Sequence, residues 1–281
     1  MKKISNSVLT GLFLSLFSML PYPSHGQSEN AVIKKYLGEL PNLPVSNHLQ
    51  KYRMTAVYTN RDLYGNFTGK TKITGDYTMG LENGNVSWNN VLHSASDKFE
   101  EPFPLGKKLE YAENFIYLPT YKMLEPASFK NFPNTAEAVF AKNLVWDMLA
   151  IDEFGLKHKD SLKLNKIYRI RDTGGKFDMA AIGNYTNTEI QLIWTGISAF
   201  DDEICAVIEH RAIDNMIELD MPGLKSKGTE QYWGTSWISL KTGLIEHAEM
   251  YSGTIQEIKI DGMKDKLLVK TIRELRLDKI K

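Results

Sequence analysis

The chain has 281 residues, with 34 basic and 34 acidic side chains and a single cysteine, Cys205. The balanced charge gives no electrostatic reason to expect binding to nucleic acid or to an anionic membrane surface. One cysteine excludes an intramolecular disulfide, so the stability of the fold must come from packing.

The first 26 residues have the pattern of a cleavable secretory signal peptide. Lys2 and Lys3 form a positive n-region, and residues 8–20 form an apolar h-region. Ser24 and Gly26 are the small residues that a signal peptidase reads. Because no lipobox cysteine follows the h-region, we expect cleavage without a lipid anchor and a periplasmic or secreted protein of the bacterial envelope.

Residues 27–281 are expected to form one soluble, β-rich domain. Removing the two lysines of the leader leaves 32 basic against 34 acidic residues. Later apolar runs fall short of the roughly 20 residues that a membrane-spanning helix needs, so we expect no transmembrane segment in the mature chain.

The first part of the expected domain reads as a short helix followed by strands. Residues 28–40 favour a short amphipathic helix that Pro41 closes. Segments rich in Thr, Tyr, Val and Trp predict strands at 52–59, 70–81 and 85–94. Asn83-Gly84 predicts a hairpin turn between the last two, since both residues tolerate positive φ.

Residues 100–134 change in character, with several prolines among many aromatic residues. Such a segment predicts a long connection packed by its own side chains, because flexible linkers are poor in aromatic residues. A long helix is predicted over about 135–154, where Asn134 supplies an N-cap and Gly155 follows the last turn.

The remaining sequence again predicts strands. They are expected at 166–171, 188–195, 203–213, 216–219, 231–240, 244–251, 254–260 and 266–277. About eleven strands beside one long helix favour a mainly β (α+β) fold, an antiparallel half-barrel or sandwich, because regular strand and helix alternation is missing.

One hairpin in this region resembles a known family. Residues 237–245, WISLKTGLI, form an aromatic-led strand, a Lys-Thr-Gly turn and a second strand. Over residues 231–277 this pattern is similar to the penultimate hairpin of the bacterial periplasmic lipoprotein carriers of the LolA type. The resemblance implies a half-open antiparallel barrel wrapped on helices, with an apolar cavity for lipid or lipoprotein acyl chains.

The aromatic residues of the strands supply the candidate ligand-binding residues. Alternation places Trp233 and Trp237 on one face of their strand, and neither face of that strand is polar throughout. Strands that are partly apolar on both faces are expected where one face packs on a core and the other lines a cavity. We therefore expect Trp194, Trp233, Trp237 and Tyr251 to edge a cavity for an apolar or lipid-like ligand, in a protein without enzymatic activity.

A hydrolase acting on an envelope lipid or polymer is the first alternative. His247 and Glu249 share one strand face with Tyr251, and Asp201 opens a strand. A histidine beside carboxylates suits general acid and base catalysis. An interaction module of the cell envelope, marked by an exposed aromatic patch, is the second alternative.

Other reactive residues favour structural roles. Cys205 and His210 lie five apart on an expected strand, which places the two side chains on opposite faces and separates a nucleophile from its base. His158 has carboxylates nearby, at Asp152, Glu153 and Asp160, but two lysines flank it and would repel a cation.

Motifs for metals, cofactors and serine hydrolases are missing from the sequence. His93, Ser94, Ser96 and Asp97 are adjacent, whereas a catalytic triad assembles from distant segments. The histidines are scattered, and no Walker A, Gly-x-Gly-x-x-Gly, Cys-x-x-Cys or His-Glu-x-x-His pattern occurs. We expect no metal and no cofactor.

Overall fold

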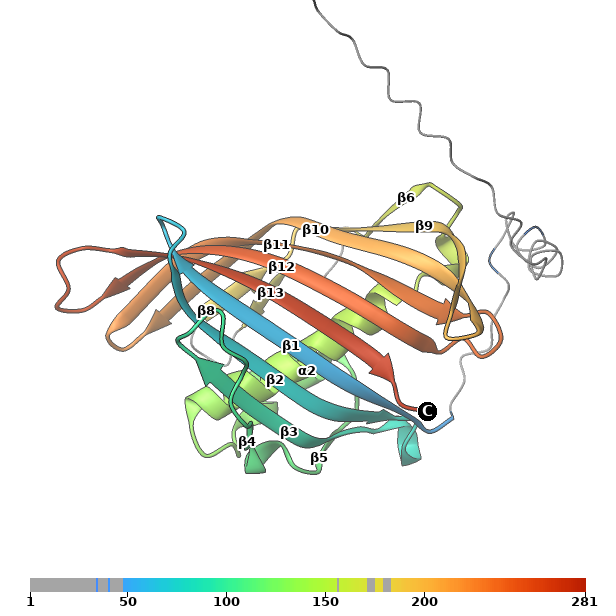
Figure 1. Ribbon diagram of the computed structural model, residues 1–281, viewed down its shortest axis with the longest axis horizontal. Helices are drawn as coiled ribbons and strands as arrows, with labels where there is room; N and C mark the ends of the chain where they lie inside the picture. The colour runs from blue at the N-terminus through green and yellow to red at the C-terminus, as the bar shows by residue number, and fades with distance from the viewer. Residues whose placement is uncertain (1–33, 35–39, 41–47, 156, 171–174, 179–182) are drawn as a thin grey trace, which may run out of the picture.

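A computed structural model describes residues 34, 40, 48–155, 157–170, 175–178 and 183–281. The expected signal peptide and nearly all of the expected helix at 28–40 lie outside these residues. In the part of the chain that is described, the fold is one antiparallel β-sheet and one long helix, α2 (Thr135–Gly155) (Figure 1).

Thirteen strands form the sheet across the described residues. The first five are β1 (Gln50–Asp62), β2 (Phe67–Met79), β3 (Val86–Ser96), β4 (Lys107–Lys108) and β5 (Phe115–Tyr117). Four more precede the long C-terminal strands: β6 (Ile167–Ile170), β7 (Lys176–Asp178), β8 (Gly183–Thr186) and β9 (Glu189–Phe200). The last four are β10 (Glu203–Met221), β11 (Leu224–Ser239), β12 (Ile245–Ile260) and β13 (Leu267–Lys279). Five short 3-10 helices lie between strands, at Glu82–Gly84, Glu110–Ala112, Tyr121–Leu124, Pro126–Phe129 and Lys159–Ser161.

The sheet is open, with the last strand of the chain near its centre. Its order is β4-β3-β2-β1-β13-β12-β11-β10, after which β9 pairs with the first half of β10 and β8 with the second half. β1 pairs with β13 from Tyr52↔Lys279 to Asp62↔Val269. The mainly β fold expected from the sequence, an antiparallel half-barrel or sandwich, is confirmed, and the sheet does not close.

Two hairpin turns form where the sequence predicts them. β2 and β3 are joined through a 3-10 turn in which Asn83 and Gly84 have φ of 58° and 74°. β11 and β12 are joined through residues 240–244, with Gly243 at φ 73°. Positive φ is accessible to glycine and tolerated by asparagine, which explains both turns.

The C-terminal strands are longer than the sequence pattern predicts. The segments expected at 203–213 and 216–219 form one strand, β10, whose register with β11 shifts between Ala212 and Asn215, where Asp214 has φ 61°. The segments expected at 244–251 and 254–260 likewise form one strand, β12. The sequence pattern predicts the end of a strand at a bulge or at a glycine, whereas a long strand can continue through either one.

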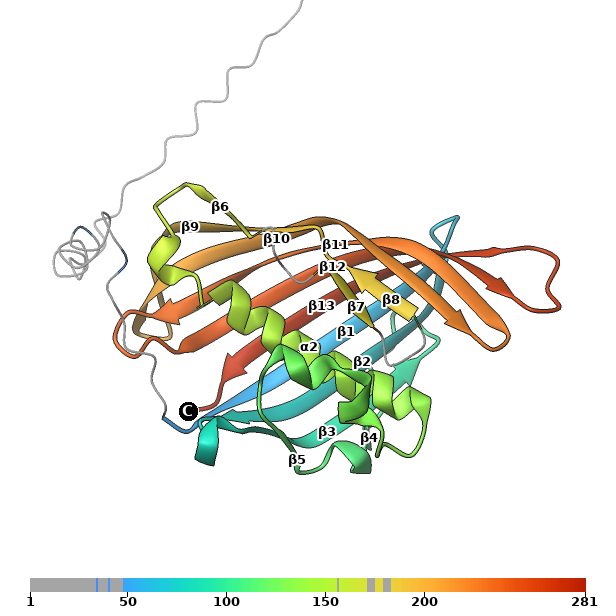
Figure 2. The same cartoon turned by 180° about the vertical axis from the view of Figure 1, so that it is seen from behind.

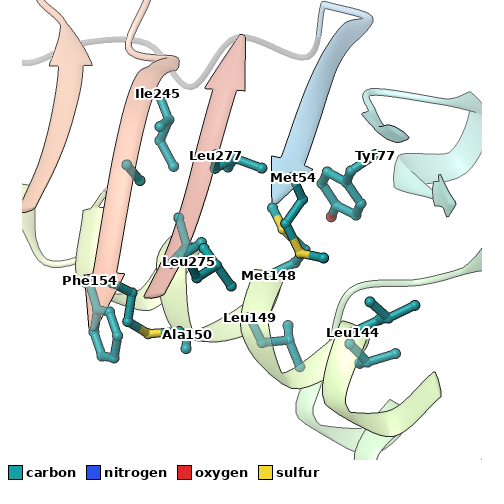
Figure 3. Close-up of a cluster of buried hydrophobic side chains, with 14 of the residues drawn as sticks. Met54, Tyr77, Leu144, Met148, Leu149, Ala150, Phe154, Ile245, Leu275 and Leu277 are labelled. Carbon is teal, nitrogen blue, oxygen red and sulfur yellow. The ribbon is translucent and has the colours of Figure 1, made fainter. Parts of the chain in front are cut away.

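Helix α2 lies against the concave face of the sheet (Figures 1 and 2). Its cap is the predicted one, because the Asn134 side chain accepts a hydrogen bond from the backbone N–H of Glu137 at 3.0 Å. Apolar helix side chains such as Leu144, Met148 and Phe154 pack on Met54, Leu275 and other core residues of the strands (Figure 3).

The connection at 100–134 packs on the helix and on itself. Its rings form edge-to-face pairs, with Phe132 against Tyr111 at 6.1 Å and against Phe115 at 5.5 Å between ring centroids. Leu124 and Phe129 of its 3-10 helices are buried in the same core as α2. The helix is thereby covered by the sheet on one side and by this connection on another. Any pocket beside the helix is bounded by these two parts of the chain.

Candidate functional site

A pocket lies between the N-terminal half of α2 and the concave face of the sheet. We call it the α2 pocket; its volume is about 180 Å³. The sheet contributes one side chain each from β1, β8, β10 and β11 and two each from β12 and β13, while β7 and a 3-10 helix close the side. The lining residues are Tyr58, Leu124, Val139, Lys142, Asn143, Trp146, Asp147, Phe177, Asp178, Tyr185, Ile217, Glu230, Ser252, Thr254, Thr271 and Arg273.

Aromatic rings form one wall of the α2 pocket. Trp146 of the helix meets Phe177 at 4.9 Å and Tyr185 at 5.5 Å between ring centroids, both edge to face. Such pairs are favoured by the quadrupoles of the rings and hold them in fixed orientations. The wall therefore offers a preformed apolar surface from three different elements.

A buried ion pair joins the helix to the sheet in the same pocket. The Arg273 guanidinium donates through Nη2 to Oδ2 of Asp147, and the two side chains are 12% and 3% exposed. The guanidinium also lies 5.3 Å from the centroid of the Tyr58 ring. Removing one partner of such a pair leaves an uncompensated buried charge, so the pair ties α2 to β13.

Further charged residues stand around the pocket. Lys142 donates to the backbone oxygen of Asp178 and lies 5.9 Å from the centroid of the Phe129 ring. Burial lowers the pKa of Lys142, partly offset by the nearby Asp178. With Glu230, the lining holds three carboxylates against two cations. The pocket is apolar in its walls and polar at a few positions, which is typical of small-molecule sites.

A second pocket of about 220 Å³ lies along the C-terminal half of α2. Its walls are mostly apolar and include Tyr77, Met148 and Leu277. Figure 3 shows these side chains around the helix, with Tyr77 and Leu277 on neighbouring parts of the sheet. The concave face thus has space beside the helix along both of its halves.

The predicted ligand-binding aromatics do not share one cavity. Trp194 is fully buried. It pairs in the sheet with Ile208, and both side chains lie on the concave face, which α2 covers. Trp233 and Trp237 lie on the opposite, convex face, since their alternating neighbours Tyr232 and Ile238 are in the core. The expected cavity edged by all three tryptophans is therefore wrong.

Trp233 and Tyr251 form an exposed aromatic pair on the convex face. Their rings stack with centroids 6.1 Å apart, and Trp233 is 49% exposed. They border an open groove that also contacts Gln191, Glu209 and Arg211. This groove is the nearest approach to the aromatic patch expected of an interaction module.

The candidate catalytic residues also meet on the convex face. His247 contacts Asp278 through Nδ1 at 2.7 Å and Glu249 through Nε2 at 3.2 Å. The Tyr251 hydroxyl donates to Glu249 at 3.0 Å, and the pKa of Glu249 is lowered because these bonds outweigh its partial burial. Because every polar atom of the imidazole already has a protein partner, this cluster reads as a structural network.

Two aromatic rings enclose the imidazole of that network. Phe200 stacks on His247 at 4.7 Å, and Trp237 lies at 5.1 Å. Asp201 is in the adjacent turn, where its exposed carboxylate pairs with Lys281 at 3.4 Å. The sequence thus correctly predicts that His247, Glu249 and Tyr251 lie together. Of these three residues, Tyr251 borders the open groove, and His247 and Glu249 are not among its lining residues.

The other reactive residues lie apart. Cys205 is buried on the convex side of β10, and burial raises the pKa of its thiol to about 12. His210 points to the concave side, as the spacing of five predicts. His158 and Lys157 both contact Glu153, each at 2.6 Å, so the carboxylate nearest His158 is committed to an ion pair.

The described residues contain no group of three metal-ligating side chains. His93 and Ser94 are in β3, and Ser96 bonds to the backbone of Lys98 in the following turn. Among these residues, no helix has both the length and the apolar character that crossing a bilayer requires.

Sequence reasoning missed the polar residues of the α2 pocket. Asp147 and Arg273 each interrupt an apolar pattern, one on the helix and one in a C-terminal strand. A buried charge calls for a partner of opposite sign, so the two interruptions could have been matched with each other. The sequence contains many carboxylates and cations, and which two of them pair depends on the order of strands in the sheet. The sequence alone does not reveal that order.

Comparison with known proteins gives little. No protein-family model matches the chain, and no curated protein sequence matches it. A solved structure described as lipid–protein interactions in lipovitellin is similar at 13% identity and a TM-score of 0.42, over 83% of this chain and 25% of the other. The chain spans about a quarter of the length of that lipovitellin chain.

Proposed function

We propose that this protein binds an apolar or lipid-like ligand in the α2 pocket, as an exported, non-enzymatic protein of the bacterial envelope. The observation that carries the proposal is a preformed space between helix and concave sheet, with an aromatic wall at Trp146 and a buried ion pair beside it. Apolar walls with a few placed polar groups favour binding of a molecule that is mostly apolar.

The proposed export rests on the leader pattern of residues 1–26. The non-enzymatic role rests on chemistry: the acids and the histidine that could catalyse hydrolysis are bonded to one another on the convex face, away from the α2 pocket. A half-barrel with a helix on its concave face also agrees with what the LolA-type resemblance implies.

Titration with cis-parinaric acid, whose fluorescence rises in an apolar environment, tests the proposal. Trp146→Ala removes the aromatic wall and is expected to weaken binding at least tenfold. Trp233→Ala is the matched control, because it removes the same side chain from the convex face, and its affinity should stay within twofold of wild type. Equal effects of the two changes, or no saturable binding to the wild-type protein, would contradict the proposal.

A further inference from the structure

The sheet extends beyond the helix that covers its concave face. The β10–β11 and β12–β13 hairpins project past the N-terminal end of α2, as Figures 1 and 2 both show. From Thr254, which lines the α2 pocket, to Ile260 at the end of β12, six residues of strand span about 20 Å.

The concave face of this projection is mostly apolar. Alternation along each strand fixes the face on which a residue lies. The α2 pocket is lined by Ile217, Glu230, Thr254 and Thr271, and the register of these strands continues without a shift from there to their ends. The same face continues through Gly228, Ser226 and Gln256 and through six apolar residues, Leu219, Leu224, Ile258, Ile260, Leu267 and Val269, which we call the concave strip. Leu267 is 40% exposed and the others are half-buried.

The convex face of the same strands is mostly charged. Lys225 pairs with Asp220 at 3.2 Å, and Lys266 pairs with Glu257 at 2.6 Å. The hairpins are therefore amphipathic, with a solvated outer face and an apolar inner face. Leu219 packs against the core, and the rest of the strip continues past the N-terminal end of α2 (Figures 1 and 2). Contiguous apolar surface of this kind is typical of a binding site.

The α2 pocket alone is small for a lipid. Its volume of about 180 Å³ lies below the roughly 300 Å³ at the lower end of ligand pockets. The concave strip begins at the residues that line this pocket, on the same strands and the same face. A ligand that is too long for the pocket therefore has a mostly apolar surface ahead of it, interrupted by Gln256 beside Thr254.

We propose that the concave strip binds the extended hydrocarbon chain of the ligand whose other part occupies the α2 pocket, so that the protein selects long, single-chain segments. This inference rests on the proposed function. An extended chain of atoms advances about 1.2 Å per bond, since three backbone bonds span roughly 3.5 Å. The 20 Å strip therefore accommodates about 17 carbons of a chain whose remaining part occupies the pocket.

A ladder of octanoate, dodecanoate and hexadecanoate, each displacing cis-parinaric acid, measures the contribution of chain length. A fully buried CH₂ contributes about 0.8 kcal/mol, or roughly fourfold in affinity, and a chain with one side on the strip should gain about half of that free energy. We expect hexadecanoate to bind the wild-type protein at least one hundredfold more tightly than octanoate.

Two matched double variants locate the effect. Ile258→Ser with Leu267→Ser changes a cross-strand pair of the concave strip. Ile255→Ser with Leu268→Ser changes the same residue types on the same two strands, on the convex face, where they are 54% and 37% exposed. The concave double variant should lose at least tenfold in hexadecanoate affinity with octanoate within twofold, whereas the convex one should keep both affinities.

The outcomes separate the two proposals. If octanoate binds but longer chains gain nothing, or if both double variants behave alike, the strip does not bind the chain and only this inference is overturned. If no probe binds the wild-type protein, the proposed function fails and the inference with it. If the concave changes instead turn a dimer into a monomer in sedimentation, with the ladder intact, the strip is a contact between copies and the inference is wrong.

Discussion

His210 is a buried ionisable side chain on the concave face of the sheet. Its ring stacks on Phe154 of α2 with centroids 4.2 Å apart, and neither ring nitrogen has a hydrogen-bond partner among the described residues. A Cβ at Gly234 would stand 2.7 Å from Cε1 of this ring, so the absence of a side chain there makes room for it. Burial lowers the pKa of His210 to about 3.

The low pKa of His210 predicts acid sensitivity. Between pH 6.5 and about 3 the unfolded chain binds a proton at this ring and the folded chain does not, so the free energy of unfolding falls as the pH drops through that window. The loss is about 1.4 kcal/mol per pH unit. His210→Leu should therefore lose roughly 2 to 3 kcal/mol less than wild type between pH 6.5 and pH 4.5 in urea denaturation. Parallel losses in the two proteins would show that the ring is not the cause.

Single residues also show where sequence reasoning stops. Alternation alone separates Cys205 from His210 and groups His247 with Glu249, because the period of a strand is local. Alternation does not reveal which face of the sheet the helix covers. The sequence therefore predicts one cavity from aromatic residues that lie on both faces. For Trp194 and Trp233 that choice depends on the packing of α2, a contact between segments far apart in the chain.

At the scale of elements, helix α2 could be predicted well because its signals are local. Its start follows from Asn134, its end from Gly155, and its core side from the spacing of Leu144 and Met148. For 203–221 and for 245–260 the sequence predicts two strands where the structure has one. A bulge and a glycine have the sequence pattern of a turn, and the partner strand that distinguishes them is not known from the sequence.

Asn134→Ala tests the contribution of the cap. The change removes the side-chain acceptor for the Glu137 N–H, and we expect about 1 kcal/mol less stability in chemical denaturation. Asn143→Ala is the matched control, because this exposed residue lies within the helix, where alanine has the higher helix propensity. Its stability should equal or slightly exceed that of wild type; a loss as large as that of Asn134→Ala would rule out a specific capping effect.

The order of strands is the feature of the whole molecule that the sequence did not provide. Hairpins between neighbours such as β11 and β12 follow from local turns, whereas β1 pairs with β13 across more than 200 residues. Nothing in either segment specifies the other, because many strands have the same alternation. The antiparallel half-barrel could thus be predicted as a class but not as a particular order.

Removing residues 267–281 should abolish cooperative unfolding. The deletion takes away β13 and with it Leu275 and Leu277, which are fully buried between β1 and β12. Circular dichroism against urea is expected to show no sharp transition for this variant. Removing only residues 280 and 281, which follow β13, should leave the midpoint close to that of wild type. A cooperative transition in the longer deletion would show that β1 and β12 do not depend on the strand between them.

The position of β13 between β1 and β12 also determines when the sheet can be completed during folding. β13 follows β1 by more than 200 residues and follows every other described strand, so both of its neighbours, β1 and β12, have an exposed edge until it is inserted between them. Unpaired strand edges are templates for association with other chains. Until β13 is inserted, β1 and β12 can therefore pair with other copies of the protein, and its insertion is the step that joins the two parts of the sheet.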